Sequence, residues 1–222
     1  METYLTDGTL KQAVADGYVL VERTTESGVR LGIVGLIDLD DYDFDPKKKT
    51  LIRATEGTVI SRIPPRVKIR ENAAIELPHV MLLVDDPIDR QKIDGCQGAT
   101  QEDAVNIAAV KHGIIEYVYA IRDTLRKIYD TELMQGGGHI RGYAVEGEAA
   151  KQVTEAFAAK QNSCGGFLFA VGDGNHSLAT AKTCWENIKK SGKFTEEQLK
   201  THPARHALVE ICNLHSEALE FK

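Results

Sequence analysis

The strongest candidate for a ligand-binding or reactive site is a glycine-rich turn between an apolar run and a helix-forming run. Residues 166–171 are apolar, Gly172-Asp-Gly-Asn-His-Ser177 follows, and a helical pattern continues to about Lys190. The first turn of a helix has unpaired N–H groups and partial positive charge, and glycine lets the backbone approach a ligand closely. The turn therefore suits a phosphate or carboxylate group. Its candidate phosphate-binding residues are Gly172, Gly174, Asn175 and Ser177.

Two side chains of this turn could also do chemistry. Asp173 could hold a metal ion or accept a proton, and His176 could act as an acid or base or donate to an oxyanion. The alternative is a structural turn, in which Asp173 or Asn175 caps the helix and the glycines allow a tight bend. Local chemistry supports the two interpretations equally.

A second candidate is the arginine-rich segment between residues 51 and 72. Its arginines could bind phosphate or carboxylate groups through paired hydrogen bonds; they are Arg53, Arg62, Arg66 and Arg70. Glu56 is the nearest carboxylate that could act as a base. A solvated basic surface is the competing interpretation, and the separate anion-binding turn favours a site.

Other patterns point to no chemistry. The acidic run at residues 38–45 lacks the glycine that a helix–loop–helix calcium site needs at its sixth position, so a solvated strand end is predicted. The glycine-rich turn matches neither familiar nucleotide-binding pattern, and no nucleophile elbow is present. Trp185, at helical spacing, is predicted to lie in the core.

The elements that must position these residues follow from apolar periodicity. Strands are predicted at residues 18–24, 29–39, 78–85, 140–145 and 166–171, with a last extended region at 206–221. Helices are predicted near the N-terminus and at residues 102–129, with a break allowed near Gly113, and at residues 148–160 and about 175–190. The segment at 134–139 is either a flexible linker or, at residues 136–139, a mobile flap over a site. Pro64 and Pro65 are expected to stop any helix that begins near Thr58.

Strands alternating with helices indicate an α/β fold, with α+β as the alternative, built on a mixed sheet with helices packed on it. Residues 1–222 are expected to form one domain, with possible halves at 1–100 and 101–222. The extended end suggests a fragment of a longer protein.

Composition narrows the class of protein. The net charge of −6 argues against a general nucleic-acid coat, and no apolar run is long enough to span a membrane. The start lacks a signal-peptide pattern, and four widely spaced cysteines indicate reduced thiols in a cytoplasmic protein. We expect a small-molecule or nucleotide partner, and neither a nucleic acid nor a membrane.

Four segments in order together resemble the bacterial domain-of-unknown-function family 1015 along nearly the whole chain. They are residues 52–58, 63–72, 132–139 and 171–182. Members of that family are longer at both ends, which agrees with the expectation of a fragment.

The turn is also similar, more distantly, to the phosphate-binding turn of the ParB/sulfiredoxin-like superfamily, which includes free-serine kinases. Asp173, Gly174 and His176 match that turn, whereas Asn175 and Ser177 stand where a His and an Arg are usual. The resemblance implies a ParB/sulfiredoxin-like core. One of Arg53, Arg62 and Arg66 would have to replace the missing arginine.

These observations predict a nucleotide- or phosphate-using domain, such as a small-molecule kinase or a nucleotide hydrolase. Mg²⁺ and a nucleotide such as ATP or ADP are the expected cofactors. Asp173 would bind the metal, Glu56 would act as the base, and His176 with an arginine would stabilise developing charge. The alternative is a non-catalytic module that binds an anionic ligand or regulates another protein.

Overall fold

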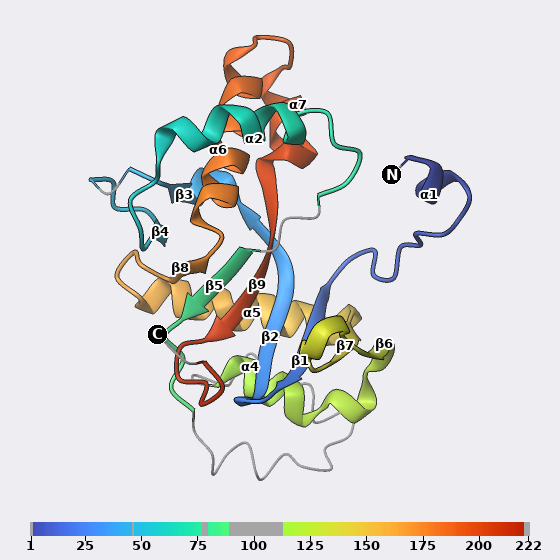
Figure 1. Ribbon diagram of the computed structural model, residues 1–222. Helices are drawn as coiled ribbons and strands as arrows, with labels where there is room; N and C mark the ends of the chain where they lie inside the picture. The colour runs from blue at the N-terminus through green and yellow to red at the C-terminus, as the bar shows by residue number, and fades with distance from the viewer. Residues whose placement is uncertain (1, 46, 77–79, 89–112, 220–222) are drawn as a thin grey trace. The chain divides into compact units, whose positions relative to one another are not determined.

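The computed structural model describes residues 2–45, 47–76, 80–88 and 113–219 (Figure 1). Their strands form a nine-stranded mixed sheet in the order β3-β4-β8-β5-β9-β2-β1-β7-β6. The strands are β1 (Tyr18–Thr25), β2 (Gly28–Asp38), β3 (Tyr42–Asp43), β4 (Ile52–Ala54), β5 (Val80–Val84), β6 (Arg126–Glu132), β7 (His139–Val145), β8 (Phe169–Asp173) and β9 (His206–Asn213). The predicted mixed sheet of an α/β fold is confirmed.

Helices of very different length accompany the sheet in the described residues. They are α1 (Glu2–Thr6), α2 (Ile63–Arg70), α4 (Ile114–Ala120), α5 (Gly147–Ser163), α6 (Asn175–Lys190) and α7 (Glu196–Lys200). Of the helices predicted from periodicity, the two at residues 148–160 and 175–190 are confirmed as α5 and α6.

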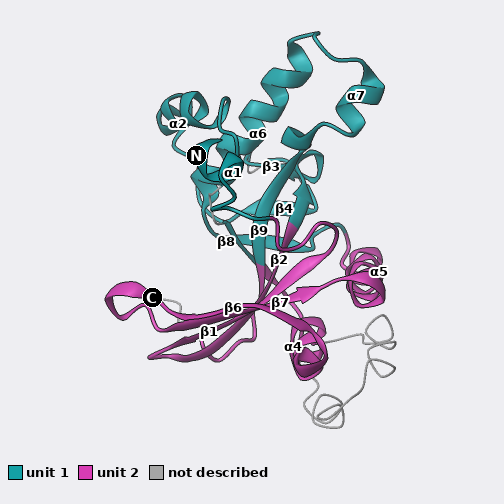
Figure 2. Ribbon diagram, turned by 90° about the vertical axis from the view of Figure 1, so that its right-hand side faces the viewer, with its two compact units in different colours: residues 1–11, 36–82, 166–210 teal, residues 12–35, 83–165, 211–222 magenta. Residues whose placement is uncertain are grey.

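The chain divides into two compact units, which Figure 2 colours separately. Unit 1 comprises residues 1–11, 36–82 and 166–210, and unit 2 comprises residues 12–35, 83–165 and 211–222. Each unit therefore draws on residues from both sides of residue 100.

Unit 1 carries the glycine-rich turn on parallel strands and a long helix. In this unit β4 pairs in parallel with both β3 and β8. Helix α6 follows β8 directly and buries Leu178, Ala181 and Trp185, whose spacing of three and four residues places them on one helix face. The prediction that Trp185 lies in the core is confirmed, because its side chain is 1% exposed.

The acidic run at residues 38–45 follows the end of β2, and Asp40 and Asp41 are exposed, as predicted for a solvated strand end, but Asp40 and the backbone beside it also bond to α6. Asp40 accepts hydrogen bonds from Trp185 Nε1 at 2.9 Å and from Lys189 Nζ at 2.8 Å. The buried Lys182 donates to the carbonyl of Leu39 at 2.9 Å. Because α6 supplies all three donors, the acidic run acts as an anchor for that helix.

Unit 2 contains antiparallel strands. In this unit β1 pairs with β2 and with β7, and β6 pairs with β7. The predicted linker at residues 134–139 is the turn of the β6–β7 hairpin, closed by a hydrogen bond of 2.7 Å from Leu133 N–H to the carbonyl of Gly138. Gly138 has a φ of +80°, and a Cβ there would collide with the carbonyl of Thr24. Only glycine fits this position without strain.

The predicted helix at residues 102–129 was wrong beyond Ala120. Residues 102–112 lie outside the described residues, α4 spans Ile114–Ala120, and Arg126–Glu132 is strand β6. The apolar stripe continued through Leu125 and Ile128, but pairing with β7 gives the backbone of this segment its hydrogen bonds. Pairing with β7 thus makes this segment a strand, although its apolar residues are spaced as in a helix.

The prolines of the arginine-rich segment begin a helix, where they were expected to stop one. Pro64 and Pro65 lie in the first turn of α2, after a short 3₁₀ turn at Ile60–Arg62. A proline is tolerated there because first-turn N–H groups have no intrahelical partner.

The strands predicted at residues 18–24, 29–39 and 140–145 are confirmed within one residue as β1, β2 and β7, and the other predicted strands are confirmed with shorter bounds. The last extended region becomes β9, which ends at Asn213, and the strand expected at 78–85 becomes β5; residues 78 and 79 lie outside the described residues. Cys184 and Cys212 are buried, and Cys164 is partly exposed. Cys96 lies outside the described residues.

His139 ties the two strands of the β6–β7 hairpin together through an ion-pair cluster. Its Nδ1 lies 2.7 Å from Glu132 Oε1 and its Nε2 lies 2.5 Å from Asp130 Oδ1. Both ring nitrogens can donate only in the imidazolium form. The hydrogen bonds to Glu132 and then to Asp130 raise the pKa of His139 above its ordinary value.

This arrangement predicts a pH dependence of stability. A raised pKa in the folded state stabilises fully below the unfolded-state pKa of about 6.5, and the contribution is lost as the pH rises through the folded-state value. His139→Gln should therefore lower the free energy of unfolding most near about pH 6, with a shrinking difference towards about pH 9. Urea unfolding of both proteins across this range measures the difference.

A difference that stays constant with pH would contradict the imidazolium assignment. Glu132→Gln provides a control, because it keeps His139 but removes one carboxylate. The pKa of His139, followed by NMR, should fall in that variant.

Candidate functional site: an uncapped helix beside a cavity in unit 1

The glycine-rich turn connects β8 to α6 through a single left-handed residue. Gly174 has a φ of +85° and stands at the N-cap, where its N–H donates to Asp173 Oδ1 at 2.6 Å. The first intrahelical bond runs from Leu178 N–H to the Gly174 carbonyl, at 2.9 Å. In the described part of the chain, no side chain caps the N-terminus of α6. The N–H groups of the first helical turn are thus left as donors for another acceptor.

Asn175 holds the neighbouring loop in place. Its side chain is 4% exposed, its Oδ1 accepts the N–H of Thr55 at 3.3 Å, and its Nδ2 donates to Thr55 Oγ1 at 3.4 Å. The hydroxyl of Thr55 in turn donates to the carbonyl of Val171 at 2.6 Å. Asn175 is therefore a positioning residue, and its amide is already hydrogen-bonded on both of its polar atoms.

His176 holds the other end of the same loop, residues Thr55–Val59. Its Nε2 accepts the backbone N–H of Val59 at 3.2 Å, so a neutral ring carries its proton on Nδ1. The Nε2 atom is not free to serve as a base in this arrangement. His176 thus positions the Thr55–Val59 loop, which contains Glu56.

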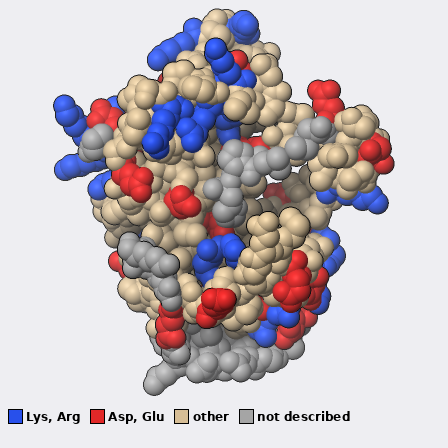
Figure 3. Space-filling model, viewed as in Figure 1, with Lys and Arg blue, Asp and Glu red and all other residues tan. Residues whose placement is uncertain are grey.

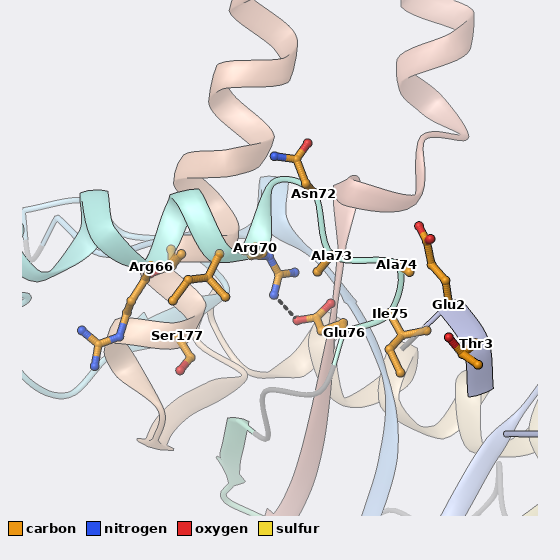
Figure 4. Close-up of a pocket in the computed structure, with 12 residues that line it drawn as sticks. Glu2, Thr3, Arg66, Arg70, Asn72, Ala73, Ala74, Ile75, Glu76 and Ser177 are labelled. Atoms are coloured by element: carbon orange, nitrogen blue, oxygen red, sulfur yellow. Dashed lines mark hydrogen bonds and ion pairs between the residues drawn. The ribbon is translucent and has the colours of Figure 1, made fainter. Parts of the chain in front are cut away.

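A cavity of about 800 Å³ opens beside the first two turns of α6 (Figure 4). All its lining residues belong to unit 1, and they come from α1, α2, the segment after α2, and α6. The lining comprises Glu2, Thr3, Arg66, Ile69, Arg70, Asn72, Ala73, Ala74, Ile75, Glu76, Ser177 and Thr180. The structure therefore brings together Ser177 and Arg66, two residues that the sequence singled out separately.

The two arginines of the cavity differ in their partners. Arg70 Nη1 forms an ion pair of 2.6 Å with Glu76 Oε1, which Figure 4 marks with a dashed line. Arg66 donates from Nη1 to the carbonyl of Arg62 at 3.2 Å, and no carboxylate of the described residues pairs with it. Among the described residues, Arg66 is therefore the arginine of this cavity that has no carboxylate partner.

Four other predicted residues lie away from the cavity lining. Arg53 donates to the carbonyls of Thr50 and Gly166, at 3.0 and 3.3 Å, and lies 4.4 Å above the ring of Phe167. Arg62 ends the 3₁₀ turn before α2 and is exposed. Glycines 172 and 174 shape the backbone of the turn and present no side chain.

The two carboxylates predicted for catalysis are both exposed, and neither lines the cavity. Glu56 lies in the Thr55–Val59 loop, and Asp173 ends β8. Among the described residues, no group of three or more His, Cys, Asp or Glu side chains could hold a metal ion. Asp173 is thus a single carboxylate next to the uncapped helix.

Three residues of the cavity lining were not among the predicted phosphate-binding residues: Arg70, which lies in the predicted basic segment, Glu76 and Thr180. Arg66 and Arg70 are four residues apart, which places them on the same side of a helix. That spacing would have grouped them if a helix had been predicted over residues 63–70. The Thr180 hydroxyl donates to the carbonyl of His176 at 2.7 Å, so it stabilises the first helical turn from within.

Comparison with known proteins gives a family. The profile of the family described as "Protein of unknown function (DUF1015)" matches residues 1–222, so the chain belongs to this family. No match was found among curated proteins, and none among solved structures. In the described part of the chain, no helix has the length and apolar character needed to cross a membrane.

The role assigned to Asn175 predicts a loss of stability on its truncation. Asn175→Ala removes two part-buried hydrogen bonds to Thr55 and should lower the free energy of unfolding by about 1–2 kcal/mol. Asn187→Ala changes an exposed asparagine on the same helix and should cost less than about 0.5 kcal/mol. Equal effects in chemical denaturation would refute the positioning role.

Proposed function

We propose that the cavity beside α6 binds a small molecule through a phosphate or carboxylate group. The anion contacts are the hydroxyl of Ser177, the first-turn N–H groups of α6 and the guanidinium of Arg66. One observation carries the proposal: α6 begins without a side-chain cap next to a cavity lined by Ser177 and Arg66. An anion would satisfy donors that the protein leaves unpaired.

The local charge supports an anionic ligand. The chain carries a net charge of −6, yet Lys and Arg side chains gather over α2 in Figure 3. Helix α2 supplies Arg66, Lys68 and Arg70, of which Arg66 and Arg70 line the cavity. The positive end of the α6 dipole adds to the field of Arg66 at Ser177.

The size and lining of the cavity indicate a ligand larger than a single inorganic anion. Small-molecule sites usually enclose about 300–1,000 Å³, and this cavity holds about 800 Å³. Ile69, Ala73, Ala74 and Ile75 give it an apolar wall. A ligand with an anionic end and a less polar body, such as a nucleotide, fits this distribution. The buried thiol of Cys184, which is free, suits a reducing, cytoplasmic compartment.

A second candidate function is phosphoryl transfer to a hydroxyl group. It is favoured by the contacts of Asn175 and His176, because they attach the loop that carries Glu56 to the turn that carries Asp173. In this proposal Glu56 accepts the proton of the hydroxyl, while Asp173 would hold Mg²⁺ together with the phosphates of ATP or ADP. Bound Mg²⁺ would supply charge neutralisation. His176 keeps Glu56 in place by holding the loop.

Ser177→Asp tests anion binding without harming the helix. A carboxylate in the first helical turn is stabilising by about 0.3–1 kcal/mol, so the variant should unfold at the same or a higher temperature. The same carboxylate repels an anionic ligand, so binding of pyrophosphate and ATP, measured by calorimetry, should be lost. Retained binding in this folded variant would refute the site.

Arg66→Gln tests the contribution of the unpaired cation. Loss of a charged hydrogen bond costs about 1.5–3 kcal/mol, so the affinity for pyrophosphate should fall about 10- to 100-fold. Lys68→Gln is the matched control, because it removes the same charge from the same helix at a residue that does not line the cavity. Equal losses in both variants would indicate general electrostatic attraction only.

Measuring the consumption of ATP distinguishes the two candidate functions. Phosphoryl transfer predicts that Glu56→Gln binds ATP as the wild type does but no longer consumes it with Mg²⁺ present. A binding module predicts no ATP consumption by either protein.

A further inference from the structure

The charged side chains that line the cavity beside α6 balance one another. They are two arginines, Arg66 and Arg70, and two glutamates, Glu2 and Glu76, and the other described residues of the lining carry no charge. The formal charge of the lining is therefore zero. This balance distinguishes the cavity from a purely basic anion site, in which positive charge would be in excess.

The two signs of charge lie in different parts of the lining. Both arginines belong to α2, whereas Glu2 belongs to α1 and Glu76 to the segment after α2. Figure 4 shows Arg66 and Glu2 on opposite sides of the view. Because Glu76 offsets the charge of Arg70 through their ion pair, the positive end of the cavity is at Arg66 and the negative end is at Glu2.

The negative end offers several acceptors to a cation. Glu2 is exposed, and no cationic side chain of the described residues forms an ion pair with it. Glu76 receives Arg70 on Oε1 at 2.6 Å, and an ionised carboxylate has about four acceptor positions, so it can bind a second donor. Thr3 also lines this part and has a hydroxyl oxygen. An ammonium group carries three donors, which these three side chains can accept.

The spacing of the charges suits one small molecule. Arg66 and Arg70 are four residues apart on α2, so their backbones are separated by about 6 Å along the helix axis. Glu76 contacts the guanidinium of Arg70, so a ligand that reaches from Arg66 to Glu76 has to span about one to two helical turns. Ile69 and Ala73 line the same cavity and offer apolar contacts to an aliphatic body.

We propose that the ligand of this cavity carries an ammonium group as well as an anionic group, and that Glu2 and Glu76 bind the ammonium group. The inference rests on the proposed function, which supplies the anion contacts at Ser177 and Arg66. It narrows the ligand to small zwitterions, in which a short aliphatic chain separates an amine from a phosphate or a carboxylate.

The test compares ligands that differ only in the ammonium group. Aminoalkyl phosphates with the amine at the chain end and two to six carbons are titrated by calorimetry at neutral pH, each against the alkyl phosphate of the same length. The series covers separations of about one to two helical turns. At least one aminoalkyl phosphate should bind about tenfold or more tightly than its alkyl partner, because hydrogen bonds between charged groups are strong. The same comparison with amino carboxylates and alkyl carboxylates shows which anion the site prefers.

Glu2→Gln and Glu71→Gln form a matched pair of variants. Both replace an exposed glutamate of unit 1 by its neutral isostere, but Glu71 does not line the cavity. Glu2→Gln should reduce the advantage of the ammonium group about two- to fivefold, without weakening the binding of the alkyl phosphate. Glu71→Gln should change neither affinity.

Glu76→Gln should have opposite effects on two quantities. It removes an acceptor of the ammonium group, and it also leaves Arg70 without its carboxylate partner. The advantage of the aminoalkyl phosphate should therefore fall, whereas the alkyl phosphate should bind more tightly than it binds to the wild type. A merely structural role of Glu76 would weaken the binding of both ligands. Thermal unfolding checks that each variant is folded.

The outcomes distinguish this inference from the proposed function. If no amino ligand binds more tightly than its alkyl partner, or if Glu2→Gln and Glu76→Gln both keep the full advantage, the ammonium subsite is refuted and the anion site stands. If no ligand of either series binds, the anion site fails and the ammonium subsite fails with it.

Discussion

The candidate site depends on where the side chain of Asn175 finds its hydrogen bonds. An asparagine at the start of a helix could accept N–H groups of its own first turn, but this one pairs with Thr55, which directly follows the neighbouring strand β4. The helix is left uncapped, and the loop after β4 is pinned to it. His176 repeats the pattern with Val59. Two polar side chains thus stabilise the neighbouring loop, and the helix N-terminus remains available to a ligand.

The bonds that α6 makes to residues 39 and 40 explain why its N-terminus can stay in place without a cap. Lys182 is buried and donates to the Leu39 carbonyl, while Asp40 receives bonds from Trp185 and Lys189. A buried ammonium without partners would be strongly unfavourable, so these bonds fix the helix to the turn after β2. Donors held in advance lose less entropy when a ligand binds, which favours affinity.

The sequence indicated the β8–α6 unit well because local chemistry determines it. An apolar strand, a left-handed glycine and an amphipathic helix are all short-range signals, and they identified Ser177. The charge of Arg66 predicts a role in anion binding. Pro64 and Pro65, next to it, predict the end of a helix, whereas a helix begins there. Glu76 was missed because Glu2, Ser177 and Thr180, which line the same cavity, are distant from it in sequence. The helical prediction failed in the Arg126–Glu132 strand because its partner β7 lies beyond a turn.

The alternation of the chain between units 1 and 2 has a consequence for the order of folding. The parallel pair β4–β8 joins residues more than a hundred positions apart, and unit 1 takes its last strand from residues 206–210. Contacts between such distant residues form slowly, because the chain loses the entropy of loop closure before the stabilising contacts are made. During synthesis the antiparallel β1–β2 hairpin can form early, whereas β4 must wait for β8 to emerge. The uncapped helix that would hold a ligand is therefore among the last parts of the protein to find its partners.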